Sequence, residues 1–67
     1  MSIEPTINVE DLRQVERSAW VYARRFVMVA GSFKDDGFRR FFLKKAMWHR
    51  GHAKQIRGIR QRIEAAA

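Results

Sequence analysis

The chain has 67 residues, no cysteine and a formal net charge of +7. A chain this short forms one domain at most, and its core alone gives marginal stability. The lack of cysteine excludes disulfides and thiolate zinc sites. A hydrophobic fraction of 46% is too high for a disordered basic tail. We therefore expect a folded domain that is completed by dimerisation or by docking on a partner.

Residues 1–8 show no helical pattern, and Pro5 restricts Glu4 to extended conformations, so we expect an extended N-terminal arm there. The arm carries no basic segment of the kind that begins a signal peptide. The most apolar run, residues 19–30, is too short for a transmembrane segment and contains two arginines. These features favour a cytoplasmic location.

Residues 9–30 have the apolar period of an amphipathic helix. Asn8 is suited to be its N-cap, and Glu10 and Asp11 complement the helix dipole in the first turn. Gly31 is suited to end the helix as the C′ residue. The apolar positions recur at steps of three and four residues: Val9, Leu12, Val15, Ala19, Tyr22, Ala23, Phe26 and Ala30.

Residues 31–37 read as a loop in which Asp35 or Asp36 caps the next helix, over about residues 37–64. The second helix is amphipathic with a basic back. Its apolar stripe is carried by Phe42, His49, Ile56 and Ile63 at seven-residue steps, with Phe38, Phe41, His52, Ala53 and Ile59 beside them.

Gly51 and Gly58 lie inside this second helix, where each costs about 1 kcal/mol relative to alanine. The seven-residue phase continues through both, which favours one long helix, either straight or bent near Gly51. The alternative is a three-helix arrangement broken at residues 50–52. The predicted fold class is thus all-α, a helical hairpin of two long antiparallel helices within a single domain, residues 9–67.

Gly51 and Gly58 lie on the basic side of the second helix, and their role has two interpretations. They either permit close approach of a phosphate backbone or another helix, or they are tolerated defects.

Apolar residues outside the two stripes indicate a protein–protein interface. A symmetric dimer forming a four-helix bundle, or docking into a larger assembly, would cover them. We assign Phe41 and Phe42 to the core. The predicted interface residues are Trp20, Val21, Val27, Met28, Met47 and Trp48.

His49 and His52 are three residues apart, but no third ligand is near, so we expect no metal and no cofactor. Both lie on the stripe that faces the first helix and are expected to be buried. Lys45 also falls in this stripe, where it either snorkels to the edge or pairs with Glu16 or Asp11. No arrangement of catalytic residues is evident, and we expect no enzymatic activity.

Positive charge is concentrated in the second half of the chain. From Gly37 to Glu64 there are nine lysines or arginines and one acid, whereas residues 1–30 hold four arginines and four acids. A solvated face normally mixes signs, so this pattern is typical of a surface that meets a polyanion. The predicted nucleic-acid-binding residues are Arg39, Arg40, Lys44, Arg50, Lys54, Arg57 and Arg62.

Such a face predicts a small basic protein that binds DNA or RNA through phosphates, with weak sequence specificity because phosphate contacts carry no sequence information. The alternative function is an accessory or adaptor subunit, or an inhibitor, that docks onto a larger protein or ribonucleoprotein assembly. A membrane surface is a less favoured partner, since the apolar face of the second helix is expected to pack on the first.

Overall fold

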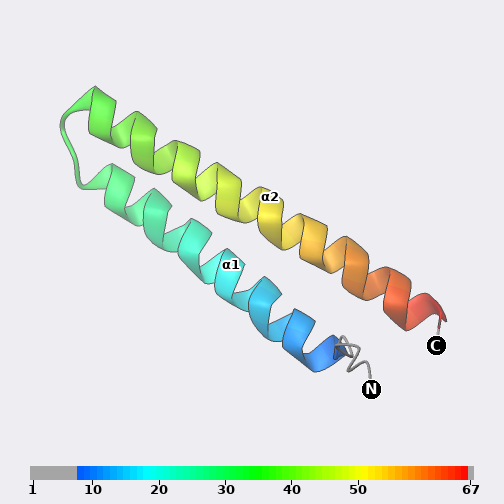
Figure 1. Ribbon diagram of the computed structural model, residues 1–67. Helices are drawn as coiled ribbons and strands as arrows, with labels where there is room; N and C mark the ends of the chain where they lie inside the picture. The colour runs from blue at the N-terminus through cyan, green and yellow to red at the C-terminus, as the bar shows by residue number, and fades with distance from the viewer. Residues whose placement is uncertain (1–7, 67) are drawn as a thin grey trace, which may run out of the picture.

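The computed structural model describes residues 8–66, which form two antiparallel α-helices joined by a short loop (Figure 1). Helix α1 spans Val9–Gly31 and helix α2 spans Asp36–Ala66. The helices lie side by side along their length, so the start of α1 and the end of α2 lie at the same end of the molecule. The predicted all-α helical hairpin is confirmed. The expected arm lies outside the described residues except for Asn8, which is extended.

Both helices begin at caps that the sequence predicts. The Asn8 side chain accepts a hydrogen bond from the Glu10 N–H at 2.9 Å. Asp35 accepts one through Oδ1 from the Phe38 N–H at 3.0 Å. In each case the side-chain oxygen satisfies a backbone donor that has no partner within the helix.

Helix α1 ends differently from the prediction. Gly31 is its last residue and not a C′ residue beyond it, and Ser32 is the C-cap with φ −84° and ψ −11°. The Ser32 N–H and hydroxyl both donate to the Val29 carbonyl, at 3.1 and 2.6 Å. Because these bonds satisfy a terminal carbonyl, no left-handed residue is needed, and none of residues 8–66 has a positive φ.

Helix α2 continues through Gly51 and Gly58 without interruption. The single long helix is therefore confirmed, and the alternative broken at residues 50–52 is wrong. The helix also extends beyond the predicted bounds, from Asp36 to Ala66. The alanines that follow Glu64 are strong helix formers and prolong it.

The seam between the helices is built mainly from alanine. The buried apolar residues of the described chain are Ala19, Ala23, Ala30, Ala46, Ala53 and Ile56. Small side chains at a helix contact allow the two axes to approach closely. The consequence is a narrow seam that covers only the centre of each apolar stripe.

Residues at the edges of the apolar stripes are consequently exposed to solvent. Tyr22, Phe38 and Phe41 were assigned to packed positions, but they are 49%, 57% and 53% exposed, and Val15 is 47% exposed. Two parallel cylinders touch along a line, so positions displaced from that line on either helix cannot be covered by the partner helix.

The hairpin is a single layer of structure. Its Cα atoms span 54 × 27 × 13 Å, with a radius of gyration of 15.8 Å. A compact domain of this length has a radius of gyration of about 11 Å. Domains usually contain two packed layers, with the core between them. Both broad faces of this molecule are therefore uncovered.

Candidate nucleic-acid interface

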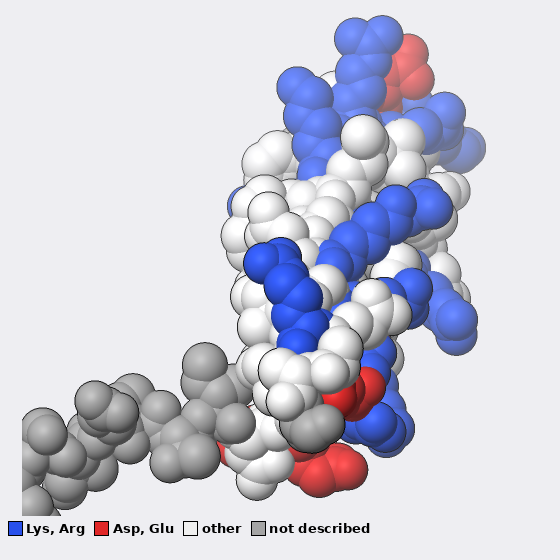
Figure 2. Space-filling view, turned by 90° about the vertical axis from the view of Figure 1, so that its right-hand side faces the viewer, with Lys and Arg blue, Asp and Glu red and all other residues white. Residues whose placement is uncertain are grey.

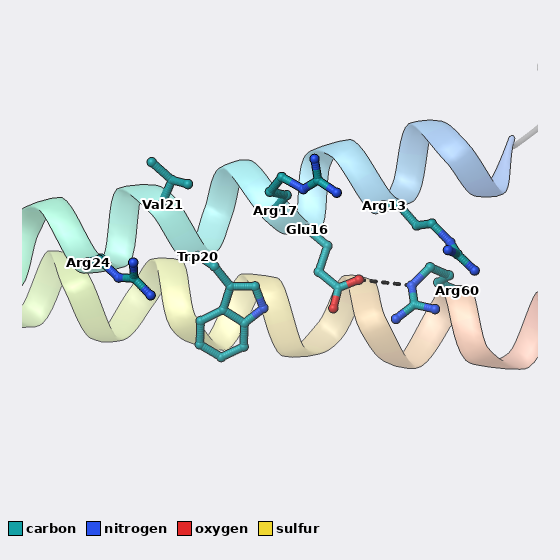
Figure 3. Close-up of a pocket in the computed structure, with 7 residues that line it drawn as sticks. All are labelled: Arg13, Glu16, Arg17, Trp20, Val21, Arg24 and Arg60. Carbon is teal, nitrogen blue, oxygen red and sulfur yellow. Dashed lines mark hydrogen bonds and ion pairs between the residues drawn. The ribbon is translucent and has the colours of Figure 1, made fainter.

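Two adjoining hollows run along one broad face of the hairpin, between α1 and α2, and together they are called the arginine groove. Their volumes are about 460 and 470 Å³, and they share Trp20 and Arg24. The first is lined by Arg13, Glu16, Arg17, Trp20, Val21, Arg24 and Arg60 (Figure 3). The second is lined by Trp20, Ala23, Arg24, Val27, Leu43, Ala46, Met47 and Arg50.

The α1 side of the groove follows from helical spacing. Arg13, Arg17, Trp20 and Arg24 recur at steps of four, three and four residues, which places them on one side of α1. These arginines were not among the predicted binding residues, because the first half of the chain is neutral overall. The signal was present in their spacing, which aligns three basic side chains with a tryptophan.

Glu16 lies at the floor of the groove and is 7% exposed. Its Oε1 accepts a hydrogen bond from Arg57 Nε at 2.9 Å, and its Oε2 accepts one from Arg60 Nε at 3.0 Å. In Figure 3 the Glu16 side chain points from α1 toward Arg60 on α2. The hydrogen bonds from Arg57 and then Arg60 lower the pKa of Glu16 against the opposing effect of burial. Glu16 is therefore ionised at neutral pH, and its charge is balanced within the chain.

Glu64 extends this network of ion pairs toward the C-terminal end of α2. It accepts hydrogen bonds from Arg13 Nη2 at 2.9 Å and from Arg60 Nη1 at 3.2 Å. These bonds, with Arg13 the larger contributor, lower the pKa of Glu64, while Glu16 and then Glu64 raise the pKa of Arg60. Both acids near the groove are thus paired, and arginine outnumbers acid around it.

Trp20 is fixed between the two halves of the groove. The Arg57 guanidinium carbon lies 5.6 Å from its ring centroid, a cation–π contact. Its indole Nε1 is buried and has no hydrogen-bond partner among the described residues. Arg57, a predicted phosphate contact, is therefore held by Trp20 and Glu16 together.

The other predicted binding residues fall into two groups. Arg50 lines the groove, and Arg39 lies on the same side of α2, where it donates to the Phe33 carbonyl at 2.9 Å. Lys54, four residues after Arg50, also lies on the groove side of α2, although it is not among the lining residues. The outer group comprises Arg40, Lys44 and Arg62, which helical spacing places on the side of α2 that points away from α1.

Arg40, Lys44, Arg50, Lys54 and Arg62 are all exposed and make no ion pair with any residue from 8 to 66. Figure 2 shows Lys and Arg side chains spread over the length of the visible face, with Asp and Glu near its two ends. The basic surface thus runs from the arginine groove around the outer side of α2.

The predicted interface residues do not form one patch. Trp20, Val21, Val27 and Met47 line the arginine groove. Met28 is 71% exposed and lines neither part of it. Trp48 is 63% exposed and borders a separate hollow lined by Phe41, Lys44, Lys45, Trp48 and His49.

His49 and His52 are half-buried, not buried as expected. The His49 ring lies 5.2 Å from that of Phe26, and the His52 ring 5.2 Å from that of Trp48. Within the described part of the chain, no group of three or more His, Cys, Asp or Glu could hold a metal ion.

Lys45 is exposed, with its Nζ 5.5 Å from the centroid of the Phe41 ring. The proposed ion pair with Glu16 is wrong, because Arg57 and Arg60 occupy that carboxylate. Asp11 makes no ion pair with Lys45 either.

Neither helix in residues 8–66 is long and apolar enough to cross a bilayer. No protein-family model, no curated protein and no solved structure matches the chain. The function is therefore inferred from the geometry and charge of the hairpin.

Proposed function

We propose that this protein binds nucleic acid through phosphate contacts along the arginine groove and the outer side of α2, with weak sequence specificity. The observation that carries the proposal is the collection of arginines from both helices on one face. Arg17 and Arg24 from α1 lie with Arg50 from α2 around a common groove, and none of the three has an acidic partner among the described residues.

Guanidinium groups suit this task. Their planar forks pair bidentately with phosphate oxygens, and each phosphate that they neutralise releases a condensed counterion. The two acids nearest the groove, Glu16 and Glu64, repel an incoming phosphate only weakly, because arginines neutralise their charge. Glu16 is paired with Arg57 and Arg60, and Glu64 with Arg13 and Arg60. A nucleic acid therefore meets a face of nearly uniform sign.

Weak sequence specificity follows from the side chains on this surface. Phosphate contacts position the protein without reading sequence, and adenine edges are read mainly by asparagine or glutamine in fixed positions. Gln55 and Gln61 are exposed on α2, but neither belongs to the groove lining. The same charge pattern accommodates DNA or RNA.

Fluorescence anisotropy with labelled duplexes and single strands of unrelated sequence tests the proposal. Binding of the full chain is expected to weaken steeply between about 50 and 200 mM salt, with a logarithmic slope of about −0.9 per phosphate contacted on duplex DNA. Arg24→Gln with Arg50→Gln is expected to weaken binding and to reduce that slope by about two.

The matched control is Arg25→Gln with Lys34→Gln, which removes the same charge from two exposed residues outside the groove. It is expected to change affinity and slope only slightly. Equal effects of the two double variants would mean that net charge alone drives binding, and an absence of salt-dependent binding to every nucleic acid would overturn the proposal.

The second candidate function, an accessory subunit or inhibitor docking on a larger assembly, is favoured by the many exposed apolar residues. The two functions differ in affinity capture from a host extract with and without nuclease. A partner that stays bound after nuclease treatment supports docking on protein, whereas release by nuclease supports the nucleic-acid proposal. A cytoplasmic location remains part of this proposal.

A further inference from the structure

A second exposed surface lies apart from the arginine groove and is built from aromatic rings. Each ring lies within 6.0 Å, centroid to centroid, of at least one other ring in the set, and the contacts link all of them into one continuous cluster. This surface is called the aromatic face. Its rings are those of Tyr22, Phe26, Phe33, Phe38, Phe41, Phe42, Trp48, His49 and His52.

Much of this apolar material is open to solvent. Tyr22, Phe38, Phe41 and Trp48 are 49%, 57%, 53% and 63% exposed. A contiguous exposed apolar patch of this kind marks a contact surface. The free energy gained by burying apolar surface scales with the area removed from water. Complete burial of one half-exposed aromatic side chain therefore contributes more stabilisation than burial of any one alanine in the seam.

The relief of the aromatic face suits a self-contact. A hollow of about 430 Å³ is lined by Asp35, Gly37, Phe38, Phe41 and Phe42, and one of about 350 Å³ is lined by Phe41, Lys44, Lys45, Trp48 and His49. Exposed rings thus border hollows on the same face. In a twofold-symmetric dimer each copy presents both exposed rings and hollows to its partner, so that rings of one copy can enter the hollows of the other.

We infer that the aromatic face is the homodimer interface, where two hairpins pack to form a four-helix bundle. The occupant is a second copy because the molecule is a single layer, 13 Å deep in its Cα atoms, and a second layer of the same kind completes a core. The arginines around the groove stay outside such a dimer, whereas Lys44 and Lys45, which are exposed, border the interface at the hollow that they line with Phe41 and Trp48.

The dimer has a functional consequence. Packing through the aromatic faces leaves the two arginine grooves on opposite outer surfaces, so one dimer can bridge two segments of nucleic acid. This consequence rests on the proposed function, whereas dimerisation itself does not depend on nucleic acid.

Sedimentation equilibrium of the full chain without nucleic acid tests the interface. The wild-type protein is expected to have twice the chain mass of 7.9 kDa at micromolar concentration. Phe41→Ser with Trp48→Ser is expected to reduce the mass to that of one chain. The control is Val27→Ser with Met47→Ser, whose side chains are 52% and 72% exposed in the arginine groove, and it is expected to remain dimeric.

A second measurement covers the case in which the separated hairpin loses its structure. The chain has no cysteine, so single spin labels can be placed at Lys45→Cys on the aromatic face or at Arg17→Cys in the groove. The distance between labels in the dimer is expected to be shorter from Lys45→Cys than from Arg17→Cys.

A monomeric wild-type chain would overturn the inference, as would a dimer that survives Phe41→Ser with Trp48→Ser or a shorter distance from Arg17→Cys. A stable association with a different protein through these residues, in place of the homodimer, would also contradict it. If the dimer forms but no nucleic acid binds, only the proposed function fails.

The bridging of two nucleic acids is tested separately. A dimer bound to an immobilised duplex is expected to capture a second, labelled duplex, and Phe41→Ser with Trp48→Ser is expected to abolish this capture.

Discussion

The carboxylate of Glu16 accepts a hydrogen bond from Arg60 Nε at 3.0 Å, joining residues 44 positions apart across the helix pair. Glu16 is buried, and the other buried residues of the described chain are alanines and Ile56. A shift of either helix along the other would leave this charge buried and unpaired, at a considerable cost in free energy. The pair therefore disfavours other registers of the hairpin.

Replacement of Glu16 by glutamine tests that relationship. Glu16→Gln is expected to lower the free energy of unfolding by about 1–3 kcal/mol, because it weakens two charge-assisted hydrogen bonds and removes their ionic component. Urea unfolding followed by circular dichroism measures the change. Glu10→Gln, an exposed acid on the same helix that makes no ion pair with a described residue, is the control and is expected to have a much smaller effect.

Stability is expected to fall in acid. Arginine partners lower the pKa of Glu16 and of Glu64 below the ordinary value of 4.5. Because the folded pKa lies below the unfolded one, the stabilisation is complete above pH 4.5 and is lost as the pH falls through the folded pKa. Unfolding by urea as a function of pH measures this loss, which is expected to be smaller in a Glu16→Gln with Glu64→Gln variant. An unchanged acid profile in that variant would contradict the assignment.

Substitution of Gly51 by alanine is expected to stabilise the hairpin by about 0.5–1 kcal/mol, because glycine in a helix interior has a higher entropic cost than alanine. A Cβ atom at Gly51 would meet no atom within 4 Å. At Gly37 it would lie 3.0 Å from Asp35 Oδ1, the oxygen that caps α2, so Gly37→Ala is expected to gain less or to destabilise. Thermal unfolding compares the two.

Gly51→Ala also decides between the two interpretations of this glycine. If it stabilises the protein and leaves nucleic-acid affinity unchanged, Gly51 is a tolerated defect. If affinity falls although the helix is more stable, the missing side chain permits close approach of a phosphate backbone, as the position of Gly51 on the basic side of α2 allows.

The two parts of the basic surface are expected to contribute unequally. Arg17→Gln with Arg24→Gln removes groove charge, whereas Arg40→Gln with Arg62→Gln removes the same charge from the outer side of α2. The groove pair is expected to weaken nucleic-acid binding more, because a strand in the groove contacts arginines of both helices at once. Anisotropy titrations at matched salt measure the difference, and a larger loss from the outer pair would move the binding surface to the back of α2.

The sequence alone predicts the two helices and the cap at Asn8, and it favours an unbroken α2 through Gly51 with Asp35 or Asp36 as its cap. These features depend on local period, side-chain capping and helix propensity, all of which act between residues a few positions apart. The C-cap of α1 was mispredicted, because the Ser32 hydroxyl donates to the Val29 carbonyl in place of the expected Gly31 cap.

The packing of the two helices determines which residues of each apolar stripe are covered and which charges are paired. The seam is narrow, so Phe38 and Phe41 are exposed although their spacing matches that of buried positions. The partners of Glu16 are Arg57 and Arg60, not Lys45. The rotation of each helix about its own axis relative to the other fixes these contacts, and it depends on how the alanines of both helices pack, which neither helix specifies alone. The same rotation brings Arg17 and Arg24 into one groove with Arg50.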